Sequence, residues 1–134
     1  MTDYFIRYRA AITAQASAVI AGDALSSGSK TQVSLAGAGN ADGAHALQFE
    51  IDVTAAPPTE GYCEVWCEPL HHDGVGVGAP FRCARVPIQI TTVADKYTCE
   101  FDGAIPEKAN YIIKAIDFGF TASLSVRSKY ASDT

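Results

Sequence analysis

Residues 45–54 read His-Ala-Leu-Gln-Phe-Glu-Ile-Asp-Val-Thr. Apolar side chains at Leu47, Phe49, Ile51 and Val53 alternate here with polar or small ones. Successive side chains of a strand point to opposite faces, so this alternation predicts a long strand with one buried face. The stretch therefore indicates β-structure.

The same period of two returns along the rest of the chain. Further strands are predicted at 62–68, 81–90, 96–102, 111–118 and 121–127, with 31–35 as a seventh and the N-terminal segment as a possible eighth. Within 81–90, Phe81, Cys83 and Arg85 lead into the run 86–90, where Pro87 indicates a sheet edge or a bulge. Asp-Gly pairs at 42–43, 73–74 and 102–103 are typical of turns. Short strands separated by turns predict an all-β, antiparallel sandwich.

The first part of the chain is rich in Ala, Ser and Gly and shows little periodicity. Residues 1–30 are predicted to form an extended N-terminal arm, and residues 31–134 the sandwich. Such an arm is either a mobile tail or a segment that lies on a neighbouring subunit. A mobile tail would leave its large apolar and aromatic side chains exposed to water, which favours the second alternative. These side chains are therefore interface candidates: Tyr4, Phe5, Ile6 and Tyr8.

Length and charge limit the functions that this chain can have. A length of 134 residues predicts one domain. The net charge is −5 without a basic cluster, which argues against nucleic-acid binding, because phosphates need concentrated positive charge. The N-terminus lacks the apolar run of a signal peptide, and no stretch is apolar and long enough to span a bilayer. We therefore expect synthesis in the cytosol and no membrane partner.

The four cysteines are predicted to be buried free thiols. Cys63 and Cys67 are four residues apart on one strand, or roughly 13 Å at about 3.3 Å per residue. That exceeds the roughly 7 Å between Cα atoms that a disulfide tolerates, and is too far for a shared tetrahedral metal ion. Cys83 and Cys99 also occupy apolar positions of alternating strands. A disulfide between neighbouring strands stays open as an alternative.

The sequence gives little support for a catalytic or a metal-binding site. His71 and His72 precede Asp73, but neighbours on an extended chain point apart, so a polar loop explains them better than a metal site. Acidic pairs at alternating strand positions are expected to be solvated: Glu50 with Asp52, and Glu64 with Glu68. No Gly-x-Ser-x-Gly elbow or phosphate-binding loop occurs. We expect no enzyme activity, no catalytic residue, no metal and no cofactor.

Trp66 is the one tryptophan of the chain, and it lies on the same predicted strand face as Glu64 and Glu68. An aromatic ring on a polar face is typical of a subunit contact or of a sugar-stacking platform. The alternative is that both faces of this strand are covered. Trp66 is therefore a fifth interface candidate.

Residues 46–130 resemble the jelly-roll cement or decoration proteins of tailed-bacteriophage heads. The resemblance rests on the order of five segments. A strand at 46–54 runs into Ala-Ala-Pro-Pro-Thr-Glu-Gly, and a strand at 62–70 precedes a Gly-rich loop. Tyr-Thr-Cys-Glu-Phe-Asp-Gly-Ala-Ile-Pro at 97–106 then leads to Asn-Tyr-Ile-Ile-Lys-Ala-Ile-Asp-Phe-Gly at 110–119 and a final Ser/Val strand. The four cysteines and His71-His72 depart from the usual pattern.

The resemblance implies a jelly-roll β-sandwich and a structural role in the virion. Such a protein is made in the host cytoplasm and binds the outer surface of the assembled capsid as a homodimer or homotrimer. Its partner is the phage major capsid protein, whose lattice it stabilises because it binds only the assembled state. The competing interpretation is a carbohydrate- or receptor-binding sandwich of a phage tail or fibre.

Overall fold

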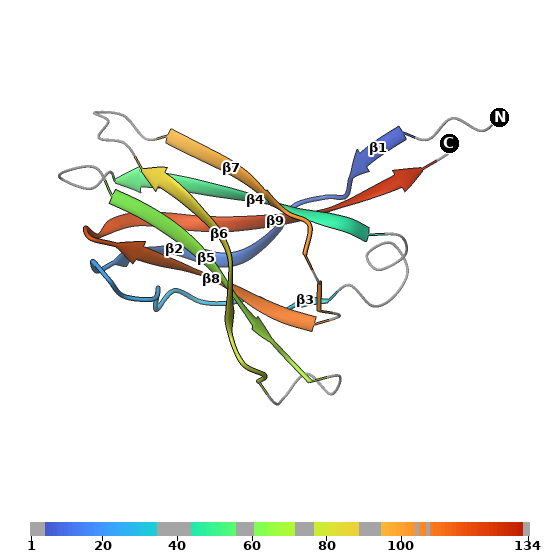
Figure 1. Ribbon diagram of the computed structural model, residues 1–134. Coiled ribbons are helices and arrows are strands. Elements are labelled where there is room, and N and C mark those ends of the chain that lie inside the picture. Colours follow the sequence, from blue (N-terminus) through green and yellow to red (C-terminus); the bar gives the residue numbers. More distant parts are fainter. Residues whose placement is uncertain are drawn as a thin grey trace.

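The computed structural model describes residues 5–34, 44–55, 61–71, 77–88, 95–103, 105, 106 and 108–132. This part of the chain folds into β-strands without a helix (Figure 1). The strands are β1 (Phe5–Tyr8), β2 (Ile12–Ile20), β3 (Val33–Ser34), β4 (Ala44–Ala55), β5 (Gly61–Pro69), β6 (Phe81–Ile88), β7 (Asp95–Phe101), β8 (Lys108–Ile116) and β9 (Phe120–Ser132). The prediction of an all-β chain is confirmed.

No helix with the length and apolar character needed to cross a membrane is found among the described residues.

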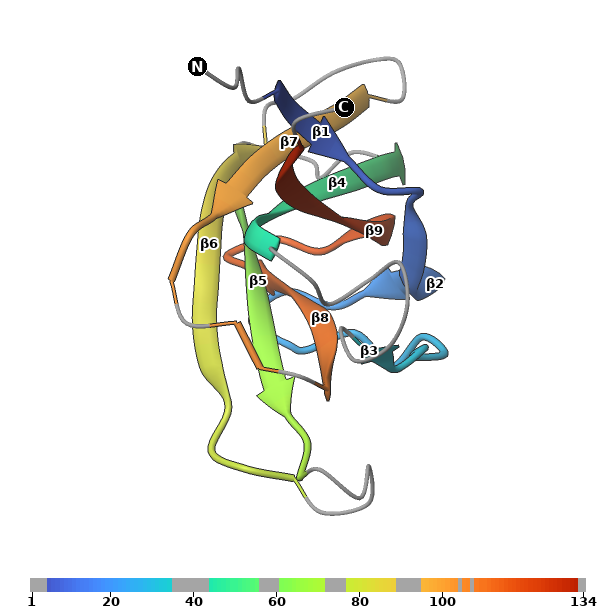
Figure 2. The same cartoon turned by 90° about the vertical axis from the view of Figure 1, so that its right-hand side faces the viewer.

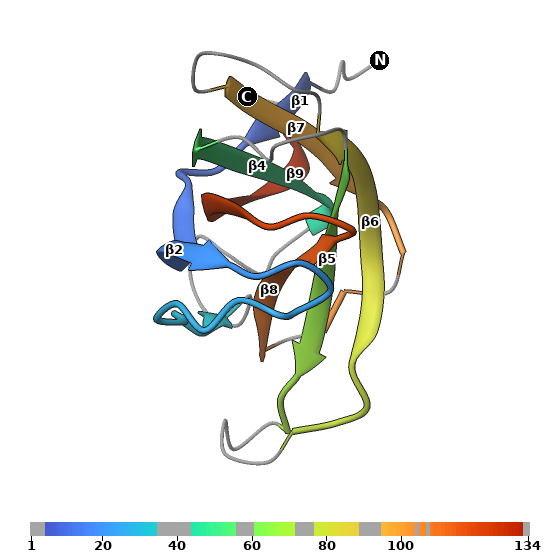
Figure 3. The same cartoon turned by 90° about the vertical axis from the view of Figure 1, so that its left-hand side faces the viewer.

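The strands form two antiparallel sheets that pack face to face. The five-stranded sheet has the order β1-β9-β4-β7, with β2 also paired with β9, and the four-stranded sheet has the order β3-β8-β5-β6. Every strand pair in both sheets is antiparallel. Figures 2 and 3 show the two layers, with β2, β4 and β9 in one and β5, β6 and β8 in the other. The predicted antiparallel sandwich is therefore present.

Much of the predicted arm belongs to the five-stranded sheet of its own chain. β1 pairs with residues 129–132 of β9, and β2 pairs with residues 120–126 of the same strand. The boundary predicted at residue 30 therefore does not separate an arm from the sandwich. Alternation failed to reveal β2 because its ladder contains two register shifts and its buried side chains include a small one, Ala14. In Figure 1, β1 and the end of β9 extend together beyond the body.

The core lies between the inner faces of the two sheets. β4 contributes Leu47, Phe49, Ile51 and Val53, all at most 1% exposed, as its alternation predicts. From the opposite sheet, the ring of Tyr111 on β8 lies with its centroid 5.4 Å from that of Phe49. Tilted aromatic pairs at this separation add stabilisation beyond the apolar area that they bury. This contact fixes which face of β4 and which face of β8 point inward.

One fully buried polar side chain joins the sheets where β2 meets β8. Gln15 of β2 accepts a hydrogen bond from the Ile113 amide at 2.9 Å and donates one to the Ser26 hydroxyl. The Ser26 amide in turn donates to the Ile113 carbonyl at 2.8 Å. A buried amide is tolerated only with such partners, because an unsatisfied one loses its hydration without compensation. Gln15 thus closes this side of the sandwich.

Replacing Gln15 should destabilise the fold without changing its strand content. Gln15→Ala leaves the Ile113 amide and the Ser26 hydroxyl without this partner, so the free energy of unfolding should fall by about 1–3 kcal/mol. Urea unfolding monitored by tryptophan fluorescence measures the loss. The exposed Gln32 offers a matched control, and Gln32→Ala should leave stability unchanged. An equal effect of the two substitutions would contradict the bridging role.

Candidate functional site: the Trp66 face

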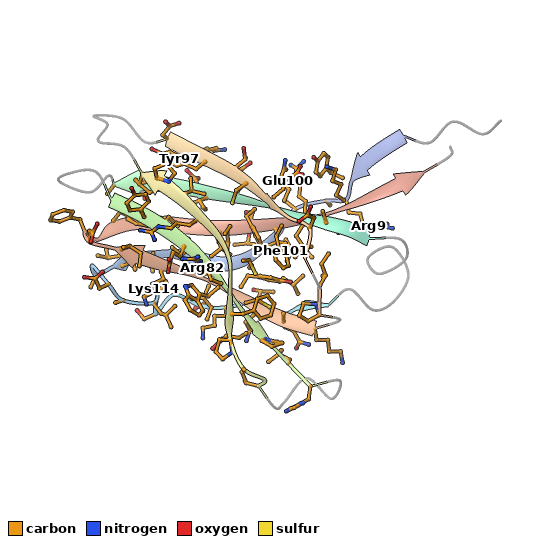
Figure 4. The ribbon with its side chains drawn as sticks, viewed as in Figure 1. Arg9, Arg82, Tyr97, Glu100, Phe101 and Lys114 are labelled. Atoms are coloured by element: carbon orange, nitrogen blue, oxygen red, sulfur yellow. The ribbon has the colours of Figure 1, made fainter. Side chains whose placement is uncertain are left out.

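The outer face of the four-stranded sheet gathers aromatic and cationic side chains around one carboxylate. We call it the Trp66 face. Strand register places Glu64 of β5 between Arg85 of β6 and Lys114 of β8, and Trp66 beside Arg82. Its members are Tyr62, Glu64, Trp66, Arg82, Arg85 and Lys114. Figure 4 labels Arg82 and Lys114 on this sheet.

Glu64 is the centre of the face and is buried, with 5% of its surface exposed. One carboxylate oxygen accepts a hydrogen bond from the Trp66 indole at 3.0 Å, and the other accepts one from the Arg82 guanidinium at 3.0 Å. Burial by itself raises the pKa of the Glu64 carboxyl, but the hydrogen bonds from Trp66 and Arg82 and the positive charges of Arg82 and Arg85 together outweigh it, so the pKa falls below its ordinary value. The carboxylate therefore stays charged and holds both partners in place. The prediction that Glu64 is solvated is wrong.

Cations also lie against the aromatic rings of this face. The Arg85 guanidinium is 4.2 Å from the centroid of the Tyr62 ring, and the Lys114 ammonium is 5.6 Å from that of Trp66. Such contacts are favourable because the face of an aromatic ring carries partial negative charge. A pocket of about 240 Å³ adjoins Trp66 and is lined also by Leu25, Pro80 and Lys114. The half-buried Trp66 ring is thus held from two sides and borders a small apolar hollow.

A β-bulge at Cys83 brings the two arginines to the same face. Arg82 pairs with Trp66, whereas Ala84 pairs with Val65 and Arg85 with Glu64, so Cys83 is the extra residue of β6. Strict alternation from Phe81 and Cys83 would put Arg85 on the inner face, but the bulge shifts the alternation by one residue and turns Arg85 outward. The sheet edge or bulge that Pro87 indicated is present, since β6 is an edge strand and carries this bulge. The sequence therefore gave no sign that Arg82 and Arg85 converge on Glu64. The sequence indicates only the contact between Glu64 and Trp66, because the two residues are two positions apart on one strand and so share a face.

Of the other predicted interface residues, Tyr8 alone has a described side chain. Tyr4 lies outside the described residues, and Phe5 and Ile6 are in β1 with side chains outside them. Tyr8 is 39% exposed and donates a hydrogen bond to Glu100 at 2.7 Å, which lowers the pKa of that carboxyl. Because Tyr8 belongs to the five-stranded sheet, the structure does not bring it together with Trp66 in one site.

Cysteines and histidines do not assemble into a metal centre within the described ranges. The prediction that Cys63 and Cys67 are buried free thiols is confirmed, whereas Cys83 and Cys99 are only half-buried. His71 is exposed, and His72 lies outside the described residues. In the part of the chain that the structure describes, no group of three His, Cys, Asp or Glu side chains has a geometry that could hold a metal ion.

Comparison of the chain with known protein families and with curated protein sequences gives no match.

The charge on Glu64 should make stability depend on pH in the acid range. A carboxyl whose pKa is lowered by folding stabilises the protein above its ordinary value of 4.5, and this contribution is lost as pH falls through the lower, folded value. Unfolding in urea, followed by the fluorescence of the single tryptophan, should show stability falling between about pH 6 and about pH 3. The fall should be smaller in Glu64→Gln, which does not titrate. Identical pH profiles in the two proteins would contradict this assignment.

Proposed function

We propose that this protein is a non-enzymatic structural protein of a bacteriophage virion. It binds the outer surface of the assembled capsid and stabilises the lattice of the major capsid protein. Its contact surface is the Trp66 face, and it acts as a homodimer or homotrimer. No cofactor, nucleic acid or membrane takes part in this role. The proposal combines the sequence resemblance with the geometry of the face.

A jelly-roll topology is part of this proposal, and the strand order supports it. Counting from β2, the first strand pairs with the eighth, the eighth with the third and the third with the sixth. In the other sheet, the second pairs with the seventh, the seventh with the fourth and the fourth with the fifth. This is the arrangement expected when one long antiparallel hairpin is rolled into two sheets. β1 adds a short strand beside the end of β9, where an extended N-terminal segment leaves the body.

The observation that carries the proposal is the preformed state of the Trp66 face. Tryptophan, tyrosine and arginine are the residues that most often dominate the binding energy of protein interfaces, and all three types occur here. Because Glu64 already holds Trp66 and Arg82, these long side chains lose less conformational freedom when a partner binds. The face is thus suited to adhesion to another protein.

The same carboxylate is poorly suited to catalysis. A general acid needs a pKa raised towards neutrality, whereas the pKa of Glu64 is lowered. Glu68, the next acid on this face of β5, forms an ion pair with Lys30 at 3.1 Å. Glu64 is therefore unsuited to the role of the protonated acid that glycoside hydrolysis uses.

The pocket beside Trp66 favours a second candidate, a carbohydrate-binding module of a tail or fibre. A half-buried tryptophan that borders a small hollow resembles a sugar-stacking platform. However, stacking needs a free ring face, and the Lys114 ammonium occupies the space over one face of Trp66. The indole N–H is also engaged by Glu64 and is not available to a sugar hydroxyl. Protein binding is therefore the better supported of the two functions.

Capsid binding is the direct test. Purified protein is mixed with capsids assembled from the major capsid protein encoded in the same genome, and the pelleted particles are analysed for bound protein. We expect saturation at a fixed ratio to the capsid subunits and greater resistance of the capsids to heat. Absence of a capsid gene from that genome, or no saturable binding, would refute the proposal. Retention on a glycan array that is lost in Trp66→Ala would favour the second candidate instead.

Substitutions on the Trp66 face should weaken capsid binding selectively. Trp66→Ala removes the central aromatic contact and should lower affinity at least about tenfold, as truncation of an interface hot spot does. Arg82→Ala should act in the same direction. Thr98→Ala is the matched control, since Thr98 is an exposed strand residue of the opposite sheet. Circular dichroism checks that each variant is folded, and an equal loss in the control would argue against this face.

A further inference from the structure

Two thiols lie side by side behind the Trp66 face, on the neighbouring strands β5 and β6. Cys67 pairs with Phe81, and Cys83 is the bulged residue two positions further along β6. Both side chains face the interior, where Cys67 is fully buried and Cys83 half-buried on the outermost strand of its sheet. The register therefore sets Cys83 diagonally across from Cys67, with both side chains packed on the same inner face. The bulge thus creates a dithiol pair at a sheet edge.

A buried hydroxyl lies beside this pair. Tyr111 is opposite Cys67 on β8 and is 1% exposed. Its hydroxyl is buried and forms no hydrogen bond with any described residue, although the Cys67 sulfur lies close enough for this hydroxyl to stabilise a thiolate there. An unused donor beside a thiol is costly in the ground state and becomes favourable when the sulfur carries negative charge.

The four thiols differ in how readily they ionise. The hydrogen bond from Cys83 lowers the pKa of the Cys67 thiol against the opposing effect of burial, and Tyr111 adds to this lowering. The same hydrogen bond, followed by burial, raises the pKa of Cys83. Burial raises the pKa of Cys63, and raises that of Cys99 to about 11. Cys67 is therefore the thiol that forms a thiolate first, with Cys83 as its immediate neighbour.

We propose that Cys67 and Cys83 are an oxidation site, at which a hydroperoxide converts the two neighbouring thiols of β5 and β6 into an intramolecular disulfide. The Cys67 thiolate attacks one oxygen of hydrogen peroxide, so an S–O bond forms, the O–O bond breaks and hydroxide leaves. The Cys83 thiol then attacks the resulting sulfenic acid, so the S–S bond forms and the second oxygen leaves as water. The thiol protons end in the products, and one peroxide is reduced to two waters while two thiols are oxidised.

The fold favours this pairing over the others. Cys63 and Cys67 are separated by roughly 13 Å along one strand, beyond the roughly 7 Å limit between Cα atoms. Cys99 is on β7, in the opposite sheet, and it affects the pKa of Cys83 through charge alone, whereas Cys67 affects that pKa first through a hydrogen bond. Cys83 alone is on a strand hydrogen-bonded to that of Cys67, with its side chain on the same inner face.

The disulfide would fix the two strands directly beneath the binding face. Trp66 and Arg82 are the sequence neighbours of the two cysteines, pair with each other across β5 and β6, and point outward. A covalent link at this step would hold Trp66 and Arg82 in register while the virion is outside a reducing cytoplasm. This consequence rests on the proposed function, whereas the disulfide itself does not.

The test measures thiols in the purified full-length protein. The reduced protein is treated with hydrogen peroxide and then unfolded in N-ethylmaleimide, and its mass and peptide map are recorded. We expect two maleimide adducts in place of four, on Cys63 and Cys99, and a peptide that links Cys67 to Cys83. The melting temperature should rise by several degrees, because the link restrains the unfolded chain. Four adducts, a link that contains Cys99, or a link between two copies would overturn the proposal.

Two variants assign the roles of the thiols. Cys83→Ser removes the resolving thiol, so Cys67 should stop at a sulfenic acid that dimedone traps, and no disulfide should form. Cys99→Ser, which replaces another half-buried thiol, should still form the disulfide. Peptide mapping of the unsubstituted protein decides the proposal even if a variant fails to fold. Its outcome does not depend on capsid binding, so the two proposals can fail separately.

Discussion

The packing of Tyr111 against Phe49 is the contact on which the rest of the structure depends. The two rings join the middle of the sandwich across its core, one from each sheet. Once Tyr111 faces inward, the period of two sends Ile112 and Lys114 of β8 outward, and pairing with β5 sets Trp66 and Glu64 beside them. A slip of one residue would bury Glu64 in the apolar core and expose Cys67. The core and the Trp66 face are therefore determined by a single register.

The sequence predicted the elements that rest on alternation and missed those that rest on local departures from it. β4, β5, β7 and β9 follow from apolar side chains at every second position. β2 was not predicted, because two register shifts interrupt its alternation. Its place in the sheet also depends on Gln15, a polar residue that no sequence pattern marks as buried. The presence of Arg82 and Arg85 on the same face was not predicted, because the spacing of residues does not show that the bulge lies at Cys83. A single inserted residue changes which side chains share a face, and its position depends on partners distant in the chain.

The charge of the Trp66 face differs in sign from that of the whole chain. The protein carries a net charge of −5, whereas this face presents Arg82, Arg85 and Lys114 around one carboxylate. An acidic partner surface is repelled by most of such a molecule and attracted by this part of it. Electrostatic attraction of this kind orients the encounter and raises the association rate more than it raises the final affinity. In the capsid contact that we propose, this face would therefore select the orientation of binding as well as supply contacts.

Glu64 is buried on an outer sheet face, and this burial has an energetic cost that its partners must offset. Removing Glu64 from water costs several kcal/mol, and its partners recover this only when the geometry is good. An apolar residue at position 64 could contribute as much to stability, but it would leave the Arg82 guanidinium and the Trp66 indole free to adopt many conformations. The carboxylate restricts both through hydrogen bonds of 3.0 Å each. Its effect is to specify one arrangement of the exposed side chains, which would lower the entropic cost of the capsid contact that we propose.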